Sequence, residues 1–214
     1  MNEAYVEAII KAAFRRAQVE LGVDKRGLGV DVVHVTEIAY CLRKAFFERR
    51  VGAKYSGEKL VIVGLGRAAH LLVERFMGDD VVKEFHVEAD VGGVKLSGMP
   101  DLVLDDVVLE LKTASRIPEQ PFPHHVLQLQ AYLHLLDRRY GFIVYIDKRR
   151  GRVKAYKVER DPGAWEEIVG RARRLHLALV RGEPPPPEPG PLCRFCEFRS
   201  MCYKARPAPY ARSG

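Results

Sequence analysis

The sequence predicts an α/β fold in which helices flank one mixed central sheet. Segments with apolar residues at helical spacing alternate along the chain with segments in which every second residue is apolar, so helices and strands are interleaved. The 214 residues, 47% of them hydrophobic and 29% charged, are enough for one globular domain with a full core and a small appendage.

Each predicted element has a local signal. Residues 3–21 show apolar side chains at helical spacing and end at Gly22, and a second helix begins at Thr36 and runs to about Arg49. Period two over residues 81–112 predicts three or four antiparallel strands. The other predictions are a turn at Gly92 and Gly93, helices at 64–77, 124–139 and 162–181 (Asp161 as N-cap, Pro162 first), and strands at 142–147 and 153–158.

Charge and hydropathy narrow the class of protein. The net charge of +7 favours an anionic partner, nucleic acid before all others. No apolar run approaches the length of a membrane span, and the first residues form a charged amphipathic pattern rather than a signal peptide. We therefore expect a soluble, cytoplasmic protein.

One hairpin carries the strongest chemical signal. The acidic pair Asp105 and Asp106 separates two alternating runs, which predicts a turn there. That turn sets the register, so Asp101 lies opposite Glu110 with roughly 5 Å between Cβ atoms. Such a pair is destabilising unless one carboxylate is protonated or a cation lies between them. Lys112 shares the face of Glu110.

The opposite face of this hairpin is apolar. Four leucines are expected to point into a core: Leu102, Leu104, Leu109 and Leu111. The acidic face is then a candidate metal site; the alternative is a solvated hairpin whose acids merely face each other.

The cysteines form a second signal. Cys193, Cys196 and Cys202 have the spacing C-x2-C-x5-C, and Cys41 stands alone near the start of the chain. Clustered thiols without a secretion signal favour metal ligation over disulfides, and spacing alone leaves zinc and iron–sulfur clusters open. We expect residues 1–183 to form the main domain and residues 184–214, which begin with a proline-rich strap, to close onto Cys41.

Several polar residues are weaker candidates. His70 lies within a predicted helix, and Gln128 and Tyr132 share a helix face because they are four residues apart. A basic group and the turn at 148–152 offer phosphate contacts; the group comprises Arg43, Lys44, Arg49 and Arg50. The adjacent His124 and His125 receive no role.

Together these residues resemble a known family. The set consists of His70, Pro100-Asp101, Glu110-x-Lys112, Gln128-x3-Tyr132, and one upstream and three downstream cysteines. It resembles the RecB-like branch of the PD-(D/E)xK nucleases, specifically the CRISPR-associated exonucleases of the Cas-four family, from about Thr36 to Tyr203. The resemblance implies a restriction-endonuclease-like core with an iron–sulfur-bound C-terminal segment.

The resemblance also implies roles for individual residues. His70, Asp101, Glu110 and the Leu111 carbonyl would hold manganese or magnesium, and Lys112 would position or activate the water. Gln128 and Tyr132 would arrange the lysine and the DNA. Cys41, Cys193, Cys196 and Cys202 would hold an iron–sulfur cluster, with 4Fe–4S favoured over 2Fe–2S.

The implied function is cleavage of single-stranded DNA, which prepares captured DNA for new CRISPR spacers alongside the integrase proteins. Two alternatives stay open at this point. One is a nuclease of the same superfamily in recombination or repair. The other is a non-catalytic, zinc-stabilised DNA-binding protein.

Overall fold

The computed structural model describes residues 3–20, 28–52, 55, 57–78, 81–83 and 85–204. The helices are α1 (Glu3–Glu20), α2 (Val35–Ala39), α3 (Leu42–Val51), α4 (Gly57–Phe76), α5 (Pro123–Leu135), α6 (Ala164–Arg181) and α7 (Arg199–Lys204), with a 3-10 turn at Pro191–Phe195. The strands are β1 (Val32–His34), β2 (Val81–Lys83), β3 (Val87–Asp90), β4 (Lys95–Gly98), β5 (Leu102–Leu104), β6 (Val107–Ala114), β7 (Tyr140–Asp147) and β8 (Val153–Glu159). Within the described parts of the chain, none of the helices has the length and apolar character needed to cross a membrane.

The strands form two sheets, so the prediction of a single mixed sheet is wrong. A five-stranded sheet has the order β2-β5-β6-β7-β8, and a three-stranded sheet has the order β1-β4-β3. Both are mixed, because β6 pairs with β7 and β1 with β4 in parallel while the other pairs are antiparallel. The 81–112 run divides at Met99 and Pro100. Proline has no N–H for the ladder, so β4 and β5 belong to different sheets.

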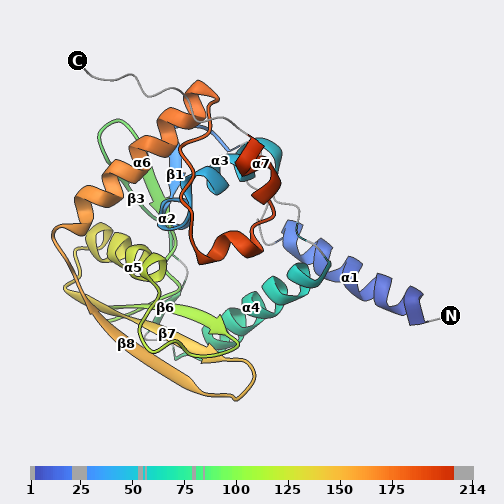
Figure 1. Cartoon of the computed structure of the whole chain (residues 1–214). Helices are drawn as coiled ribbons and strands as arrows, with labels where there is room; N and C mark the ends of the chain where they lie inside the picture. The colour runs from blue at the N-terminus through green and yellow to red at the C-terminus, as the bar shows by residue number, and fades with distance from the viewer. Residues whose placement is uncertain are drawn as a thin grey trace.

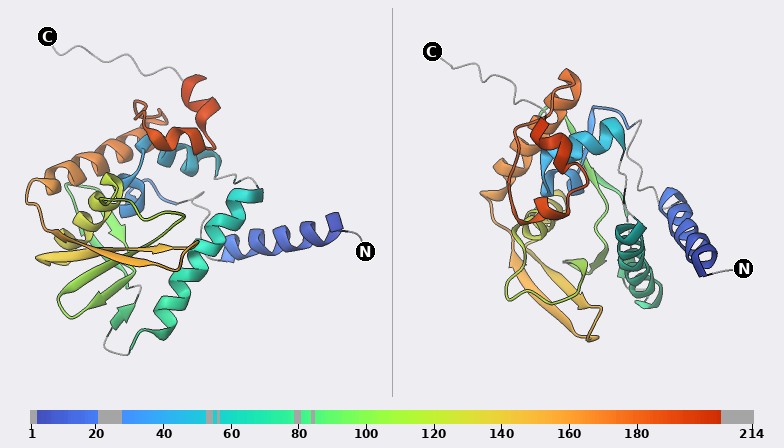
Figure 2. Two further views of the ribbon diagram at one scale, coloured as in Figure 1. Left: turned by 60° about the horizontal axis from the view of Figure 1, so that its bottom comes forward. Right: turned by 45° about the vertical axis from the view of Figure 1, so that its right-hand side comes forward.

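Helices cover both faces of the larger sheet, as the α/β prediction requires (Figure 1). Helix α4 packs on one face, where Val73 and Met77 contact Leu102 and Leu111. Helix α5 covers the other face, where Leu129 and its neighbours join the main core. Helix α1 contacts α4, and two further views show that the N-terminal end of α1 extends away from the body (Figure 2).

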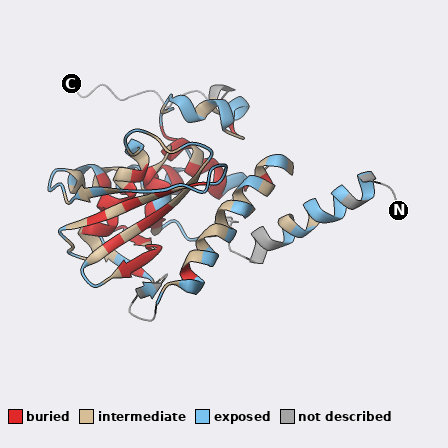
Figure 3. Cartoon of the chain, turned by 90° about the horizontal axis from the view of Figure 1, so that it is seen from below, coloured by how far each residue is buried: buried red, intermediate tan, exposed pale blue. Residues whose placement is uncertain are grey.

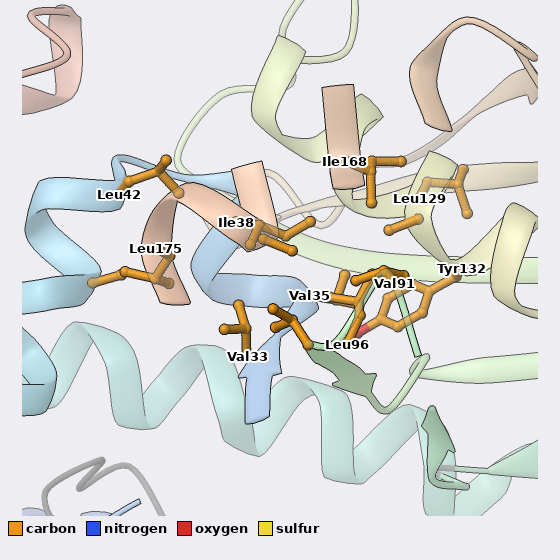
Figure 4. Packing of buried hydrophobic residues seen from close by; sticks show 14 of the residues in the cluster. Val33, Val35, Ile38, Leu42, Val91, Leu96, Leu129, Tyr132, Ile168 and Leu175 are labelled. Carbon is orange, nitrogen blue, oxygen red and sulfur yellow. The ribbon is translucent and has the colours of Figure 1, made fainter. Parts of the chain in front are cut away.

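The main core lies between the smaller sheet and helices α2, α5 and α6. Its residues include Val33 and Leu96 from paired strands, Ile38 from α2, Leu129 from α5 and Ile168 from α6, all fully buried (Figure 4). Buried residues gather in the strands and on the helix faces turned toward them, whereas α1 is mostly exposed (Figure 3). The core thus joins both sheets into one unit that holds α5 rigidly over β6.

Three helix predictions require correction. The helix expected from Thr36 to Arg49 is two helices, since Tyr40 and Cys41 are extended and Cys41 is the N-cap of α3. The helix expected at 64–77 begins seven residues earlier, at Gly57. The cap expected at Asp161 is at Gly163 instead; the Asp161 carboxylate accepts the Gly163 N–H at 2.9 Å. The predicted end of the first helix at Gly22 lies outside the described residues.

The proline-rich strap lies against the break between α2 and α3. Arg171 of α6 donates hydrogen bonds to the Ile38 and Tyr40 carbonyls and to both oxygens of Glu188 in the strap, the latter at 3.1 Å. The Glu188 carboxylate also accepts the Leu42 N–H at 3.1 Å. One guanidinium therefore joins three segments that are far apart in sequence.

Replacing this guanidinium should loosen the strap. We expect Arg171→Met to speed proteolysis within residues 184–198 and to lower the free energy of unfolding by roughly 1–3 kcal/mol, because it leaves buried carbonyls and a carboxylate without their cation. Limited proteolysis and denaturant unfolding measure both effects. Arg174→Met, at an exposed position of the same helix, is the matched control. Equal cleavage rates in the two variants would show that other contacts hold the strap.

Candidate active site

The β5–β6 hairpin has the predicted register. Leu102 pairs with Leu109, and Leu104 pairs with Val107 across a turn in which Asp105 has a φ of +50°. Asp101 immediately precedes β5, which brings it next to Glu110. The leucines of the hairpin pack against α4, as expected from the alternation. The acidic face is not solvated, because α5 covers it and leaves Glu110 only 1% exposed.

Asp101 is held at this position by two polar contacts. Its Oδ2 accepts the Leu111 N–H at 2.7 Å, and its Oδ1 lies 3.3 Å from Nδ1 of His70 on α4. Burial alone would raise the pKa of Asp101, but the His70 hydrogen bond and the charge of Lys112 outweigh burial and lower it. Asp101 is therefore an ionised carboxylate.

A third ligand-type residue lies beside this pair, and sequence reasoning missed it. Glu74, one helical turn after His70, is buried, and its carboxylate lies with His70 and Asp101 in a group whose ligand atoms are all within 4.8 Å of one another. The i,i+4 spacing of a histidine and a glutamate on one helix was the available signal. The group offers one nitrogen and two carboxylates to a cation.

Glu110 lies deeper and is turned toward Lys112 and α5. Its Oε1 accepts hydrogen bonds from Lys112 Nζ at 2.5 Å and Gln128 Nε2 at 2.6 Å, while its buried Oε2 has no hydrogen-bond partner among the residues that the structure describes. Burial, reinforced by the charge of Asp101, raises the pKa of Glu110 to about 8, although Lys112 opposes the shift. An added cation would hold this carboxylate in its charged form.

Lys112 is a cation at this site. Burial would lower its pKa, but the negative charges of Glu110 and Asp101 outweigh burial and raise it. A lysine with a raised pKa keeps its proton at neutral pH. In this arrangement Lys112 can orient a water or stabilise negative charge, and its predicted role in activating the water stays a prediction.

Gln128 and Tyr132 extend from α5 toward the same place. Gln128 holds Glu110, as described above, and Tyr132 donates to the Met99 carbonyl at 3.0 Å. The second contact fixes the segment that leads into Asp101. Both residues thus position the carboxylates, and the predicted role of either residue toward DNA stays a prediction, as does the Leu111 carbonyl as a ligand.

Cys41 and Cys193 both lie near Glu188. Cys193 Sγ lies 3.9 Å from the Glu188 carbonyl, and Cys41, at the start of α3, is close enough to Glu188 for its charge to affect the thiol. Phe198, between Cys196 and Cys202, contacts Phe47 of α3 with ring centroids 5.7 Å apart. The downstream cysteine segment therefore lies on the helix that Cys41 begins.

Within the basic group that comprises Arg43, Lys44, Arg49 and Arg50, most side chains have structural partners, whereas the turn at 148–152 is exposed. Arg43 is buried and donates to the Pro185 carbonyl at 2.6 Å, and Arg49 is buried in a salt bridge to Glu37 at 2.6 Å. Lys44 pairs with Glu48 and lies 3.5 Å from Glu197. The partners of these basic residues are distant in sequence or one helical turn away. The run of basic residues alone therefore wrongly predicted a free basic surface.

Comparison with known proteins agrees with this geometry. The model of the PD-(D/E)XK nuclease superfamily matches residues 78–203, more than half of the chain. A CRISPR-associated exonuclease Cas4 from Saccharolobus solfataricus is 28% identical over 188 residues, which cover 80% of this chain and 87% of the relative. A second Cas4 exonuclease, from Aeropyrum pernix, is 24% identical over 187 residues, which cover 78% and 90%.

A solved structure shares the fold. The crystal structure of SSO0001 superposes with a TM-score of 0.71 at 23% identity, and the match covers 90% of this chain and 95% of that one. These similarities confirm the resemblance predicted from the ordered residues. The chain belongs to the PD-(D/E)XK nuclease superfamily and is a nuclease.

Proposed function

We propose that this protein is a metal-dependent DNA exonuclease that cuts single strands and prepares DNA for CRISPR spacer acquisition. The observation that carries the proposal is the convergence of His70, Glu74 and Asp101 beside the Glu110–Lys112 pair. Two similar proteins are named CRISPR-associated exonucleases, which supports the exonuclease activity and the CRISPR context. Integrase proteins of that system are the expected partners.

The residues fit a hard divalent cation. Carboxylate oxygens and one imidazole are suitable ligands for manganese or magnesium, and within the described part of the chain the buried Glu110 Oε2 lacks a hydrogen-bond partner. A bound ion would neutralise charge on the scissile phosphate and lower the pKa of a bound water. His70, Glu74, Asp101 and Glu110 would hold it.

The remaining residues would orient the reacting groups. Lys112, which keeps its proton, lies where it can direct a water or offset the negative charge that develops on the phosphate. Gln128 keeps Glu110 in place, and Tyr132 keeps the approach to Asp101 in place. The net charge of +7 supports attraction of a polyanion.

The cysteines fit an iron–sulfur cluster. None of the four, all of which lie in the described part of the chain, is in a disulfide, and Cys41 and Cys193 both lie beside Glu188. The chemistry of phosphodiester hydrolysis needs no electron, so the cluster's role would be to fasten the strap to α3. We favour 4Fe–4S.

The first test concerns the metal ligands. Asp101→Ala and Glu110→Ala should abolish cleavage in manganese or magnesium while leaving affinity for single-stranded DNA within a few-fold, because binding depends mainly on basic groups. A gel assay with labelled ends and fluorescence anisotropy measure the two quantities. Asp106→Ala, which removes the exposed acid at the turn, is the control. Substantial residual cleavage by both ligand variants would refute the assignment.

The second test uses the raised pKa of Glu110. Because a metal binds the ionised carboxylate, manganese must displace a proton below about pH 8. Affinity should therefore fall toward acid pH, by up to roughly tenfold per pH unit, and level off above pH 8. Calorimetric titration in buffers of different ionisation enthalpy counts the protons released. Glu110→Gln should release fewer protons when manganese binds. Unchanged proton release in that variant would show that the proton does not come from Glu110.

The third test asks whether the cysteines act as one unit. Cys41→Ala, Cys193→Ala, Cys196→Ala and Cys202→Ala should each reduce the thiolate-to-iron absorbance of anaerobically purified protein. Each should also speed proteolysis of the strap, since a site with four ligands is lost or rebuilt when one ligand is removed. Iron and sulfide analysis identifies the cluster. If Cys41→Ala keeps full colour and protease resistance, Cys41 is not a ligand; zinc in place of iron would contradict the cluster itself.

A further inference from the structure

A group of aromatic rings lies where α5 begins. Phe122, the N-cap of α5, stacks on His124 with ring centroids 5.6 Å apart and planes within 5°. His124 lies 4.6 Å from the ring of Tyr40 and 4.3 Å from that of His125. The Phe122 side of the group is open to solvent, with that residue 44% exposed, whereas His125 is buried. We call Phe122 and His124 the ring pair.

The ring pair is held next to the catalytic lysine. Tyr145 of β7 is the register partner of Lys112 in β6, so their side chains leave the sheet on the same face. The Tyr145 hydroxyl lies 2.6 Å from His125 Nδ1 and accepts the Phe122 N–H at 3.1 Å. The Phe122 carbonyl in turn accepts the first amides of α5. The backbone of Phe122 is therefore held by hydrogen bonds, and its ring contacts the rings of His125 and Tyr145 at centroid distances of 5.7 and 6.2 Å.

The surface offered by these rings is uncharged. Burial, helped by the charge of Lys112, lowers the pKa of His124 and lowers that of His125 to about 2. Both imidazoles are neutral at neutral pH, so they do not present a phosphate-binding cation. Phe122 stays 44% exposed beside the nearly parallel ring of His124.

We propose, on the basis of the proposed nuclease function, that the ring pair is the surface on which a base of the DNA strand stacks when the neighbouring phosphate lies at the metal site. Aromatic side chains bind unpaired bases in this way, tolerate all four bases, and sit in single-strand channels together with basic groups. A base in a duplex is already stacked and paired, so the ring pair selects unpaired ends. It supplies a physical reason for single-strand preference.

A role in core packing does not explain the whole aromatic group at the start of α5. Packing would account for the buried rings of His125 and Tyr145, but it gives no reason for an exposed phenyl ring next to Tyr145, the register partner of Lys112. A comparable pair exists at the other end of α5, where His134 and Trp165 stack with centroids 5.2 Å apart. That pair lies away from Lys112 in the fold and provides a matched control.

The test combines substitutions with altered DNA. Phe122→Ala, Phe122→Leu and Phe122→Trp are compared with His134→Ala for binding of a short single-stranded oligonucleotide in EDTA, so that no cleavage occurs. Single abasic sites are placed at successive positions along the oligonucleotide. We expect Phe122→Ala and Phe122→Leu to weaken binding roughly 5- to 100-fold. Phe122→Trp should restore binding, and His134→Ala should leave it unchanged.

The decisive comparison combines the protein variant with the abasic oligonucleotides. At one abasic position, the natural protein should lose as much affinity as Phe122→Ala loses on the intact oligonucleotide. The same abasic position should not weaken the binding of Phe122→Ala any further. In manganese, Phe122→Ala should raise KM with little change in kcat, since the ring pair binds the substrate without touching the reacting atoms. Equal sensitivity of both proteins to every abasic position would overturn the proposal. Natural protein that neither binds nor cuts DNA would instead overturn the proposed function.

Discussion

The opposition of Asp101 and Glu110 at the end of one hairpin is the constraint on which the rest of the site depends. Two carboxylates close together in a buried setting cannot both stay charged without a compensating cation. Lys112 compensates for one charge, while burial and, after it, the charge of Asp101 raise the pKa of Glu110. Under the proposed function, a divalent ion bound here would offset the remaining charge and stabilise the folded protein.

The surrounding architecture brings polar side chains to this point from both faces of the sheet. Helix α4 brings His70 and Glu74, and it packs closely on β6, since a Cβ at Gly66 would lie 3.1 Å from the Thr113 hydroxyl. Helix α5 brings Gln128 from the opposite face. The leucines between the helices and the strands fix the distance between these elements, so the packing of the core sets the positions of these polar side chains.

Local signals predicted the hairpin well and the long-range arrangement less well. The Asp105–Asp106 turn and the alternation of leucines determine register within a few residues, and the structure has that register. The second sheet was not predictable in the same way, because β1 has only three residues and its partner β4 lies far along the chain. Glu74 was missed because helical spacing alone does not show that the helix passes Asp101. The burial of Arg43 depends on Pro185, more than a hundred residues away.

Tyr40 lies between the proline-rich strap and the ring pair. Its carbonyl accepts a hydrogen bond from Arg171, which also binds Glu188 of the strap, and its ring lies against His124. Cys41 follows directly and begins α3. A cluster at Cys41 would therefore hold the backbone from which the Tyr40 ring supports the ring pair. On this path, loss of the cluster would weaken the binding of single strands before it affected the carboxylates, because Asp101 and Glu110 are held by α4, α5 and the sheet rather than by the strap.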